Sequence, residues 1–209
     1  MAKVFIIGGG GHAKVLISVL KKAGYDIGGY TDTEDHGSIL GIPHLGSDAV
    51  LKDVVSKHQT PNAVIGIGRV DASHLRLGLQ DRLTALGFGF PVICSPNAIV
   101  NEGVRLGDGT VVLDGAIIGS GTEIGRACII NTNSVVEHDC RLGENVHIGP
   151  GVTICGGVVI GDNCMIGAGS SIVQSTRVFQ GCLIGAGSIV IEDITAPGTY
   201  VGNPTRKIR

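Results

Sequence analysis

The sequence predicts two domains: an α/β domain with a parallel sheet, followed by an all-β domain wound as a three-sided β-helix. In the first part of the 209-residue chain, short β-branched segments alternate with amphipathic ones, which is typical of a parallel sheet with helices. From Val100 to Val190 an aliphatic residue occupies every sixth position. Helices repeat about every 3.6 residues and strands about every 2, so this period indicates a solenoid of short strands and turns.

The elements of the first domain follow from its apolar segments and its glycines. We expect strands at residues 3–7, 26–32, 63–67 and 90–93, and helices at residues 12–23, 49–57 and 71–86, with a short excursion at 41–45. Gly24 is placed to cap the first helix. The pattern changes at Ser95-Pro96-Asn97, so the predicted domains are residues 1–95 and 96–209. The six-residue period is lost after Val190, so the second domain is expected to end in an extended C-terminal tail.

The repeat also defines the interior of the second domain. The residue four places after each aliphatic one is small or β-branched, which suits a tight inner corner. Four of the six cysteines occupy this position, and we interpret them as interior side chains: Cys128, Cys140, Cys164 and Cys182. The sequence contains no Cys-x-x-Cys motif, so a structural zinc site is not expected.

Composition and charge exclude several classes of partner. The net charge is −2, aromatic residues make up 3% of the chain and tryptophan is absent, so no nucleic-acid-binding surface is expected. No apolar segment approaches the length of a membrane span, and the apolar run at the start is too short for a signal sequence. We therefore expect a cytoplasmic protein that binds neither nucleic acid nor membranes.

A glycine-rich turn is the first candidate binding site. The run from Gly8 to Ala13 fits the pattern G-x-G-x-x-A between a strand and a helix, and the small domain favours a nucleotide diphosphate over a dinucleotide. Gly10 and Gly11 would let the backbone approach a phosphate at the helix start. His12 could bind phosphate or sugar, or be an exposed helix residue. Asp32, at the end of the second strand, could bind ribose or base, or cap its own loop.

A histidine in the repeat is the candidate catalytic residue. Ionisable residues are sparse there, yet Glu137-His138-Asp139 places an outward-facing imidazole between two acids. A neighbouring carboxylate fixes the tautomer of an imidazole and raises its basicity, as a general base requires. The alternative is a solvated turn residue. His147 follows nine residues later, half of a coil if each coil takes about 18 residues.

A base without an enzyme nucleophile beside it suggests that the nucleophile belongs to the substrate. His138 would take a proton from an amine or a hydroxyl as that group attacks a thioester, which is acyl transfer. The oxyanion that forms needs a hydrogen-bond donor, and a backbone amide in Cys155-Gly156-Gly157 is a candidate. His147 could instead contact the acyl carbonyl or the acyl donor.

Four segments together resemble the bacterial sugar O-/N-acyltransferase family of the hexapeptide-repeat acyltransferases: GGGGHAKV, NTNSVVEHDC, the six-residue repeats and VGNPTRKI. The family includes sialic acid O-acetyltransferases and N-acetyltransferases of nucleotide-linked 4-amino-sugars. The resemblance implies a Rossmann-like N-terminal domain that binds a nucleotide-diphosphate sugar. It also implies a left-handed β-helix that forms a homotrimer, with acetyl-CoA between adjacent helices and no metal.

The resemblance also implies roles for individual residues. His138 would be the base, Asp139 its supporting acid and Gly156 the oxyanion donor. Contacts with acetyl-CoA are expected from His147, Gly156, Ala168, Gly185 and Ala186, and contacts with the nucleotide sugar from Gly10, Gly11, His12, Asp32, Thr33, Gly68, Arg69 and Asn131. The chain departs from the family pattern at Thr33, where Asp or Lys is frequent, and at Arg69, where Asn is common. The identity of the base (uracil, guanine or thymine) therefore stays open.

Three functions are compatible with these residues. The favoured one is an acetyl-CoA-dependent N-acetyltransferase that acts on the amino group of a nucleotide-linked 4-amino-deoxy sugar. The second is O-acetylation of a sialic acid or a related sugar, since one histidine base can serve an amine or a hydroxyl. The third is a non-catalytic scaffold or a zinc-binding trimer, but such a zinc site needs three histidines and the repeat contains only His138 and His147.

Overall fold

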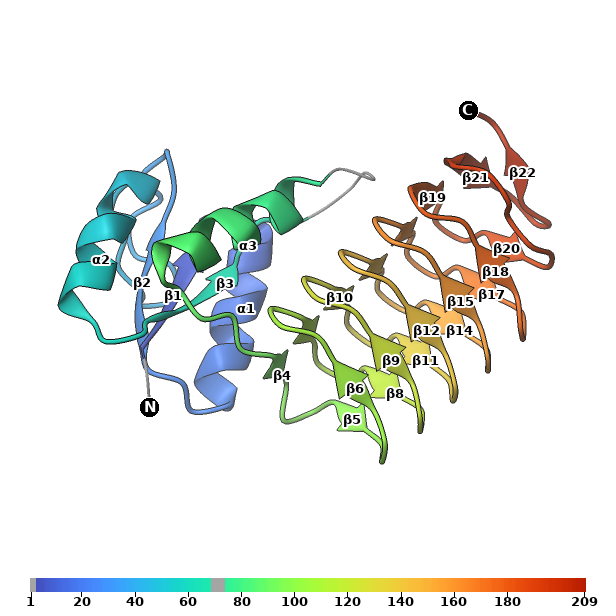
Figure 1. The fold of residues 1–209 in the computed structure, drawn as a ribbon, viewed down its shortest axis with the longest axis horizontal. Coiled ribbons are helices and arrows are strands. Elements are labelled where there is room, and N and C mark those ends of the chain that lie inside the picture. Colours follow the sequence, from blue (N-terminus) through green and yellow to red (C-terminus); the bar gives the residue numbers. More distant parts are fainter. Residues whose placement is uncertain (1–2, 69–73) are drawn as a thin grey trace. The chain divides into compact units, whose positions relative to one another are not determined.

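The computed structural model describes residues 3–68 and 74–209, which form two compact units (Figure 1). The first unit contains residues 3–68 and 75–96, and the second contains residue 74 and residues 97–209. The first is an α/β unit and the second a β-solenoid, as the sequence predicts. Within the described part of the chain, no helix is long and apolar enough to cross a bilayer.

The first unit is built on a three-stranded parallel sheet. β1 (Val4–Ile7) lies between β2 (Ile27–Thr31) and β3 (Asn62–Ile65) and pairs with both in parallel. The helices are α1 (Gly11–Lys22), α2 (Leu51–Lys57), which follows a 3-10 turn η1 (Asp48–Val50), and α3 (Leu75–Leu86). The C-cap of α1 is Ala23, and Gly24, the expected cap, follows it with a φ of +75°. Residues 71–73 of the expected third helix lie outside the described residues.

The carboxyl ends of these strands are in register. Ile7 pairs with Thr31 on one side and with Ile65 on the other. The segments that follow therefore leave the sheet at one edge: the glycine turn after β1, Asp32 after β2 and Gly66 after β3. In open parallel sheets, ligands bind at this edge.

The expected fourth strand at residues 90–93 is wrong. Gly89, just before this segment, forms a single bridge to Asn62 of the sheet, and Phe90 packs into the core of the unit. Pro91 follows, and a proline has no N–H to continue a ladder. The apolar character of the segment therefore reflects core burial. The next strand, β4 (Ile93–Cys94), begins later and is not part of the three-stranded sheet.

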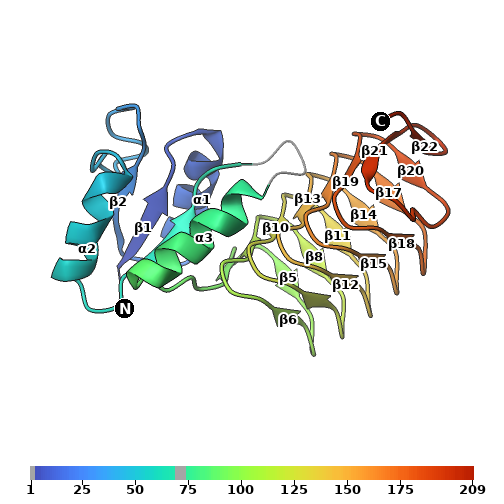
Figure 2. The same cartoon turned by 45° about the horizontal axis from the view of Figure 1, so that its top comes forward.

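The second unit is a solenoid of short parallel strands in three sheets (Figure 2). Most strands pair with a strand 18 residues later, as Ile130 does with Ile148, whereas Ile184 pairs with Tyr200, 16 residues later. The first sheet contains β7 (Val111–Val112), β10 (Ile129–Ile130), β13 (His147–Ile148), β16 (Met165–Ile166), β19 (Cys182–Ile184) and β21 (Gly198–Val201), which pairs antiparallel with β22 (Arg206–Lys207). The second contains β5 (Ile99–Val100), β8 (Ile117–Ile118), β11 (Val135–Val136), β14 (Thr153–Ile154), β17 (Ser171–Ile172) and β20 (Ile189–Val190). The third contains β6 (Arg105–Leu106), β9 (Glu123–Ile124), β12 (Arg141–Leu142), β15 (Val159–Ile160) and β18 (Arg177–Val178).

The interior of the solenoid is filled by the residues that the repeat predicts. From Val112 to Val190 every sixth-position aliphatic residue is at most 4% exposed, whereas Val100, at the start of the solenoid, is 40% exposed. The four cysteines at the small position are fully buried free thiols: Cys128, Cys140, Cys164 and Cys182. Their interpretation as interior side chains is confirmed. Because each coil buries the aliphatic residues of the next, the strands can be as short as two residues and still stack stably.

Candidate active site

The glycine turn of the α/β unit is packed on one side and open on the other. Gly8 has a φ of +103°, and a Cβ at Gly8 or Gly9 would lie 2.7 Å from a neighbouring side chain. Apart from the adjacent residues and the backbone of α1 itself, no described atom lies within 4 Å of a Cβ built at Gly10 or Gly11, at the start of α1. The turn therefore presents bare backbone and a helix N-terminus, an arrangement that suits a phosphate.

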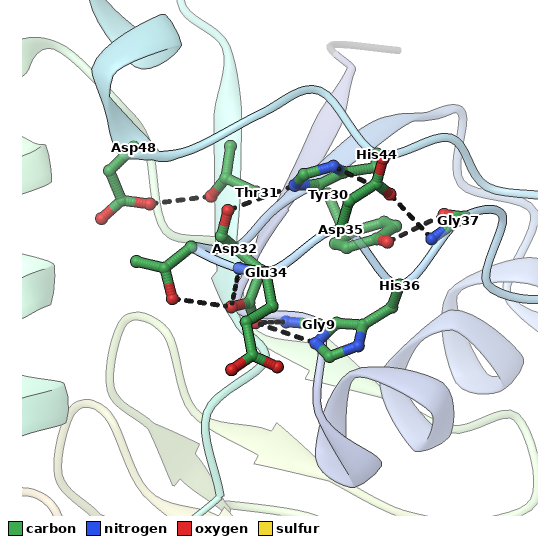
Figure 3. A network of polar contacts seen from close by, with 11 residues as sticks. Gly9, Tyr30, Thr31, Asp32, Glu34, Asp35, His36, Gly37, His44 and Asp48 are labelled. Carbon is green, nitrogen blue, oxygen red and sulfur yellow. Dashed lines mark hydrogen bonds and ion pairs between the residues drawn. The ribbon is translucent and has the colours of Figure 1, made fainter.

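Asp32 ties the end of β2 to this turn (Figure 3). Its Oδ2 accepts the Gly9 N–H at 2.6 Å, and its Oδ1 accepts the Glu34 N–H at 3.2 Å and the Thr33 hydroxyl at 3.3 Å. Burial raises the pKa of the Asp32 carboxyl, but these hydrogen bonds lower it by more, so the pKa lies below its usual value. Asp32 and Thr33 also line a hollow of about 310 Å³ beside Gly8.

The loop after Asp32 is braced by its own polar side chains (Figure 3). The buried Tyr30 hydroxyl donates to the Gly37 carbonyl at 2.8 Å, and burial raises its pKa. The His44 ring lies between the Asp35 carboxylate, 3.1 Å from Nδ1, and the Asp32 carbonyl, 3.2 Å from Nε2. These contacts fix the path of the loop beside the glycine turn.

This path brings a residue to the site that sequence reasoning missed. His36 lines a cavity of about 590 Å³ together with Gly9, Gly10, Gly11 and Lys14. Its Nε2 lies 3.9 Å from Oδ2 of Asp32. Lys14 lies in the first turn of α1. No local motif marks His36, because its position depends on how the whole loop folds.

Two of the other residues that are expected to contact the nucleotide sugar, His12 and Gly68, lie next to each other. His12 is half-buried at the start of α1, and a Cβ at Gly68 would lie 3.4 Å from the Cβ of His12. Arg69 lies outside the described residues.

His138 and Asp139 occupy one corner of the solenoid, between the second and third sheets. Nδ1 of His138 lies 2.8 Å from Oδ2 of Asp139. The carboxylate thus holds a proton on Nδ1, and Nε2 is left as the basic atom. The His138 side chain is 62% exposed, so a substrate can reach it. Asp139 has a φ of +59°, a conformation that Asp tolerates and that turns the chain at this corner.

Gly156 lies at the same corner, one coil later, against the imidazole of His138. The Gly157 N–H donates to the His138 carbonyl at 2.9 Å, which fixes the register of the two coils. A Cβ at Gly156 would lie 2.7 Å from Nε2 of His138. Only glycine leaves room for the ring in this position. The candidate base and the candidate oxyanion donor are therefore in contact within one chain.

Asn131 and His147 form a second polar pair, on the first sheet. Oδ1 of Asn131 accepts the Thr132 N–H at 2.8 Å, so the Asn131 amide nitrogen faces Nε2 of His147, at 3.1 Å. An amide nitrogen can only donate, and Nε2 of His147 must accept. This contact requires a neutral imidazole that carries its proton on Nδ1. The His147 side chain is 7% exposed.

The structure does not bring all the expected residues of the solenoid together in one chain. Asn131, Ala168 and Gly185 each follow a strand of the first sheet, at the edge shared with the second sheet, and Ala186 follows Gly185 there. His138 and Gly156 lie at the edge shared by the second and third sheets. The second sheet separates the two groups. Residues 3–68 and 74–209 contain no cluster of three or more His, Cys, Asp or Glu side chains that could hold a metal ion.

Known families match both units. The model of the PglD N-terminal domain matches residues 3–76. The bacterial transferase hexapeptide (six repeats) matches residues 121–156 and 139–174, and the hexapeptide repeat of succinyl-transferase matches residues 157–192. These matches support the predicted left-handed β-helix. No curated protein sequence matches the chain.

Solved structures match the chain over its full length. A variant of perosamine N-acetyltransferase from Caulobacter crescentus, in complex with CoA and GDP-perosamine, is 33% identical over 100% of this chain and 98% of that chain, with a TM-score of 0.94. The acetyltransferase domain of PglB from Neisseria gonorrhoeae is 32% identical over 100% of both chains, with a TM-score of 0.92. WeeI from Acinetobacter baumannii is 25% identical over 100% of both chains, with a TM-score of 0.87. The chain therefore belongs to the bacterial sugar acyltransferase family of the hexapeptide-repeat superfamily, among its acetyl-CoA-dependent N-acetyltransferases.

Proposed function

We propose that this protein transfers the acetyl group of acetyl-CoA to the amino group of a nucleotide-linked 4-amino-deoxy sugar. The observation that supports this most directly is the corner formed by His138, Asp139 and Gly156. It holds an exposed imidazole, oriented by a carboxylate at 2.8 Å, beside a backbone position without a side chain. Such a corner supplies a general base and leaves the nucleophile to the substrate.

In the proposed mechanism the substrate amine attacks the thioester carbonyl carbon while Nε2 of His138 takes a proton from the amine. Asp139 stabilises the resulting imidazolium through Nδ1. Negative charge develops on the carbonyl oxygen, where the Gly156 N–H would donate a hydrogen bond. Collapse of the tetrahedral intermediate breaks the C–S bond, and the CoA thiolate receives the proton that His138 carries.

The α/β unit would hold the nucleotide-diphosphate part of the substrate. Gly10 and Gly11 offer open backbone at the start of α1, and Lys14 adds a positive charge beside them. We assign the nucleoside to the neighbouring hollow that Asp32 and Thr33 line. The Caulobacter crescentus relative in complex with GDP-perosamine supports a substrate of this class.

The six free thiols fit the reducing cytoplasm, where we place the reaction.

A complete site would need a second subunit. His138 and Asn131 lie on the two edges that border the second sheet. The outward positions of this sheet are uncharged: Ile99, Ile117, Val135, Thr153, Ser171 and Ile189. Ile99 is 55% and Ile117 36% exposed. In a cyclic trimer this face packs against a neighbouring subunit. The edge that carries His138 in one subunit then lies beside the edge that carries Asn131 in the next. We therefore propose a homotrimer whose active sites are shared between subunits.

A thiol-release assay with acetyl-CoA tests the proposed reaction. The acceptors are UDP-, GDP- and dTDP-linked 4-amino-sugars and free sialic acid, and the His138→Ala variant controls for other thioesterases. We expect CoA release with a nucleotide-linked amino sugar, and a product that carries one acetyl group on nitrogen by mass spectrometry. Release with sialic acid alone would establish O-acetylation instead. No release with any acceptor would contradict acetyl transfer to sugars.

A further inference from the structure

A buried arginine braces the segment that follows β3. Arg76 lies in the first turn of α3 and is 2% exposed. Its Nη1 donates to the Ile65 carbonyl at 3.0 Å and also to the Ile67 carbonyl. Ile65 is the last residue of β3, so both acceptors lie where this strand leaves the sheet at its carboxyl edge. One guanidinium thus fixes the backbone on both sides of Gly66.

The braced segment packs directly on the glycine turn. The Gly66 N–H donates to the Ile7 carbonyl at 2.7 Å. A Cβ at Gly66 would lie 2.7 Å from the Gly8 carbonyl oxygen, and a Cβ at Gly8 would lie 2.7 Å from Cγ1 of Ile67. These contacts leave no free space between the two segments. A displacement of residues 65–67 must therefore displace the glycine turn as well.

The same segment forms one wall of the proposed nucleoside hollow. Ile67 lines that hollow together with Gly8, Asp32 and Thr33. Asp32 holds the glycine turn from the β2 side through the Gly9 N–H. Arg76 holds it from the β3 side through residues 65–67. The turn is thus clamped between two charged side chains that come from opposite sides of β1.

A buried guanidinium at this place is better explained by a need to position the backbone than by a contribution to the stability of the fold. Burying a charge costs free energy, and apolar residues of similar volume often stabilise a fold as well or better. Arginine offers a planar, rigid set of donors that can satisfy two carbonyls at once, and it stays charged at any pH of interest. An apolar side chain cannot donate to either carbonyl, and a lysine ammonium, which lacks the planar group, can reproduce the two hydrogen bonds only in part. The requirement met by Arg76 is therefore a fixed backbone geometry.

We propose that Arg76 is a positioning residue of the nucleotide-sugar site, which holds residues 65–67, and through them the glycine turn, in the shape that receives the nucleotide. This inference rests on the proposed function. Arg76 acts through backbone that other residues present, so its loss should weaken nucleotide binding selectively. Acetyl-CoA would be bound by the solenoid, and its KM should not depend on Arg76.

The test compares Arg76→Gln and Arg76→Lys with Arg177→Gln, which removes the same charge from an exposed position in the third sheet. Initial rates give the KM values of both substrates, and calorimetry gives the affinity for the corresponding nucleoside diphosphate without catalysis. For Arg76→Gln we expect a rise of about tenfold in the KM of the nucleotide sugar and a matching loss of nucleotide affinity. The KM of acetyl-CoA should not change. Arg76→Lys should recover part of the loss, and Arg177→Gln should behave as the parent protein.

Two results would overturn the proposal. One is an unchanged nucleotide affinity in folded Arg76→Gln, and the other is an equal rise in the KM values of both substrates, which indicates general destabilisation. Circular dichroism and thermal unfolding establish that each variant is folded. If Arg76→Gln does not fold, the proposal is tested with Arg76→Lys, by comparing the KM of the nucleotide sugar with the KM of acetyl-CoA. Failure of the parent protein to transfer acetyl groups to any acceptor would contradict the proposed function. The calorimetric comparison would still show whether Arg76 affects the affinity for the nucleotide.

Discussion

The imidazole of His138 lies against the Cα atom of Gly156, so closely that a Cβ at residue 156 would stand 2.7 Å from Nε2. We predict that Gly156→Ala pushes the ring away and loosens its contact with Asp139. Gly156 does not have a positive φ, so alanine is compatible with the backbone there. The expected result is a fall of roughly ten- to a hundredfold in kcat, since misplacing a catalytic group is costly. The thermal unfolding temperature should change little.

Steady-state kinetics and a thermal melt on the same preparation check this prediction. A kcat equal to that of the parent protein would show that the contact with Gly156 does not place the base. A large drop in unfolding temperature would show that the substitution acts on the fold instead.

Removing the Asp139 carboxylate should lower turnover without harming the fold. An asparagine at residue 139 can present its NH₂ group to Nδ1 of His138, which favours the wrong tautomer. We expect Asp139→Asn to lose about a hundredfold in kcat, close to the loss from His138→Ala. Glu137→Gln is the matched control, because it removes an exposed carboxylate on the other side of His138. If both acid variants retain the parent kcat, Asp139 has no part in orienting the base.

The sharing of sites between subunits predicts complementation. Asn131 and His138 lie on different edges of one solenoid, so a trimer that mixes Asn131→Ala and His138→Ala chains should contain some sites with both residues intact. We expect each variant alone to be nearly inactive and the co-expressed mixture, purified through two different tags, to recover activity. Light scattering checks that the mixed species is a trimer. A mixed trimer as inactive as its parents would place both residues in a site formed by a single chain.

Much of this architecture could be predicted because its determinants are local or periodic. The interior of the solenoid repeats every six residues, so positions such as Ile130 and Ile148 follow by counting. The contact between His138 and Gly156 is an 18-residue step at one corner and follows from the same count. The glycine turn was visible because a strand, four glycines and a helix are contiguous in the sequence.

The features that escaped prediction depend on contacts between segments far apart in the sequence. The segment around Phe90 is apolar like a strand, but its side chain packs into the core while Pro91 prevents pairing. His36 reaches the glycine turn only because the loop after Asp32 is braced by Tyr30 and His44. Such arrangements arise from tertiary packing, which a local pattern does not encode.

The hydrogen bonds that Asp32 accepts make its contribution to stability dependent on pH. The folded-state pKa of Asp32 is lowered, so its contribution is complete above the unfolded-state value, about 3.9, and is lost as the pH falls through the lower folded-state value. The side chain is 23% exposed, so water screens it only in part. At pH 7 we expect Asp32→Asn to lower the free energy of unfolding by roughly 1–2 kcal/mol, because the Gly9 N–H loses a charged acceptor.

Urea unfolding followed by circular dichroism measures this difference at several pH values. The gap between the parent protein and Asp32→Asn should narrow steadily below about pH 4, as the parent carboxyl becomes protonated. Asp53→Asn, which removes an exposed carboxylate from α2, serves as the control and should show a small difference throughout. A gap for Asp32→Asn that stays constant from neutral to acidic pH would show that the charge of Asp32 does not hold the glycine turn.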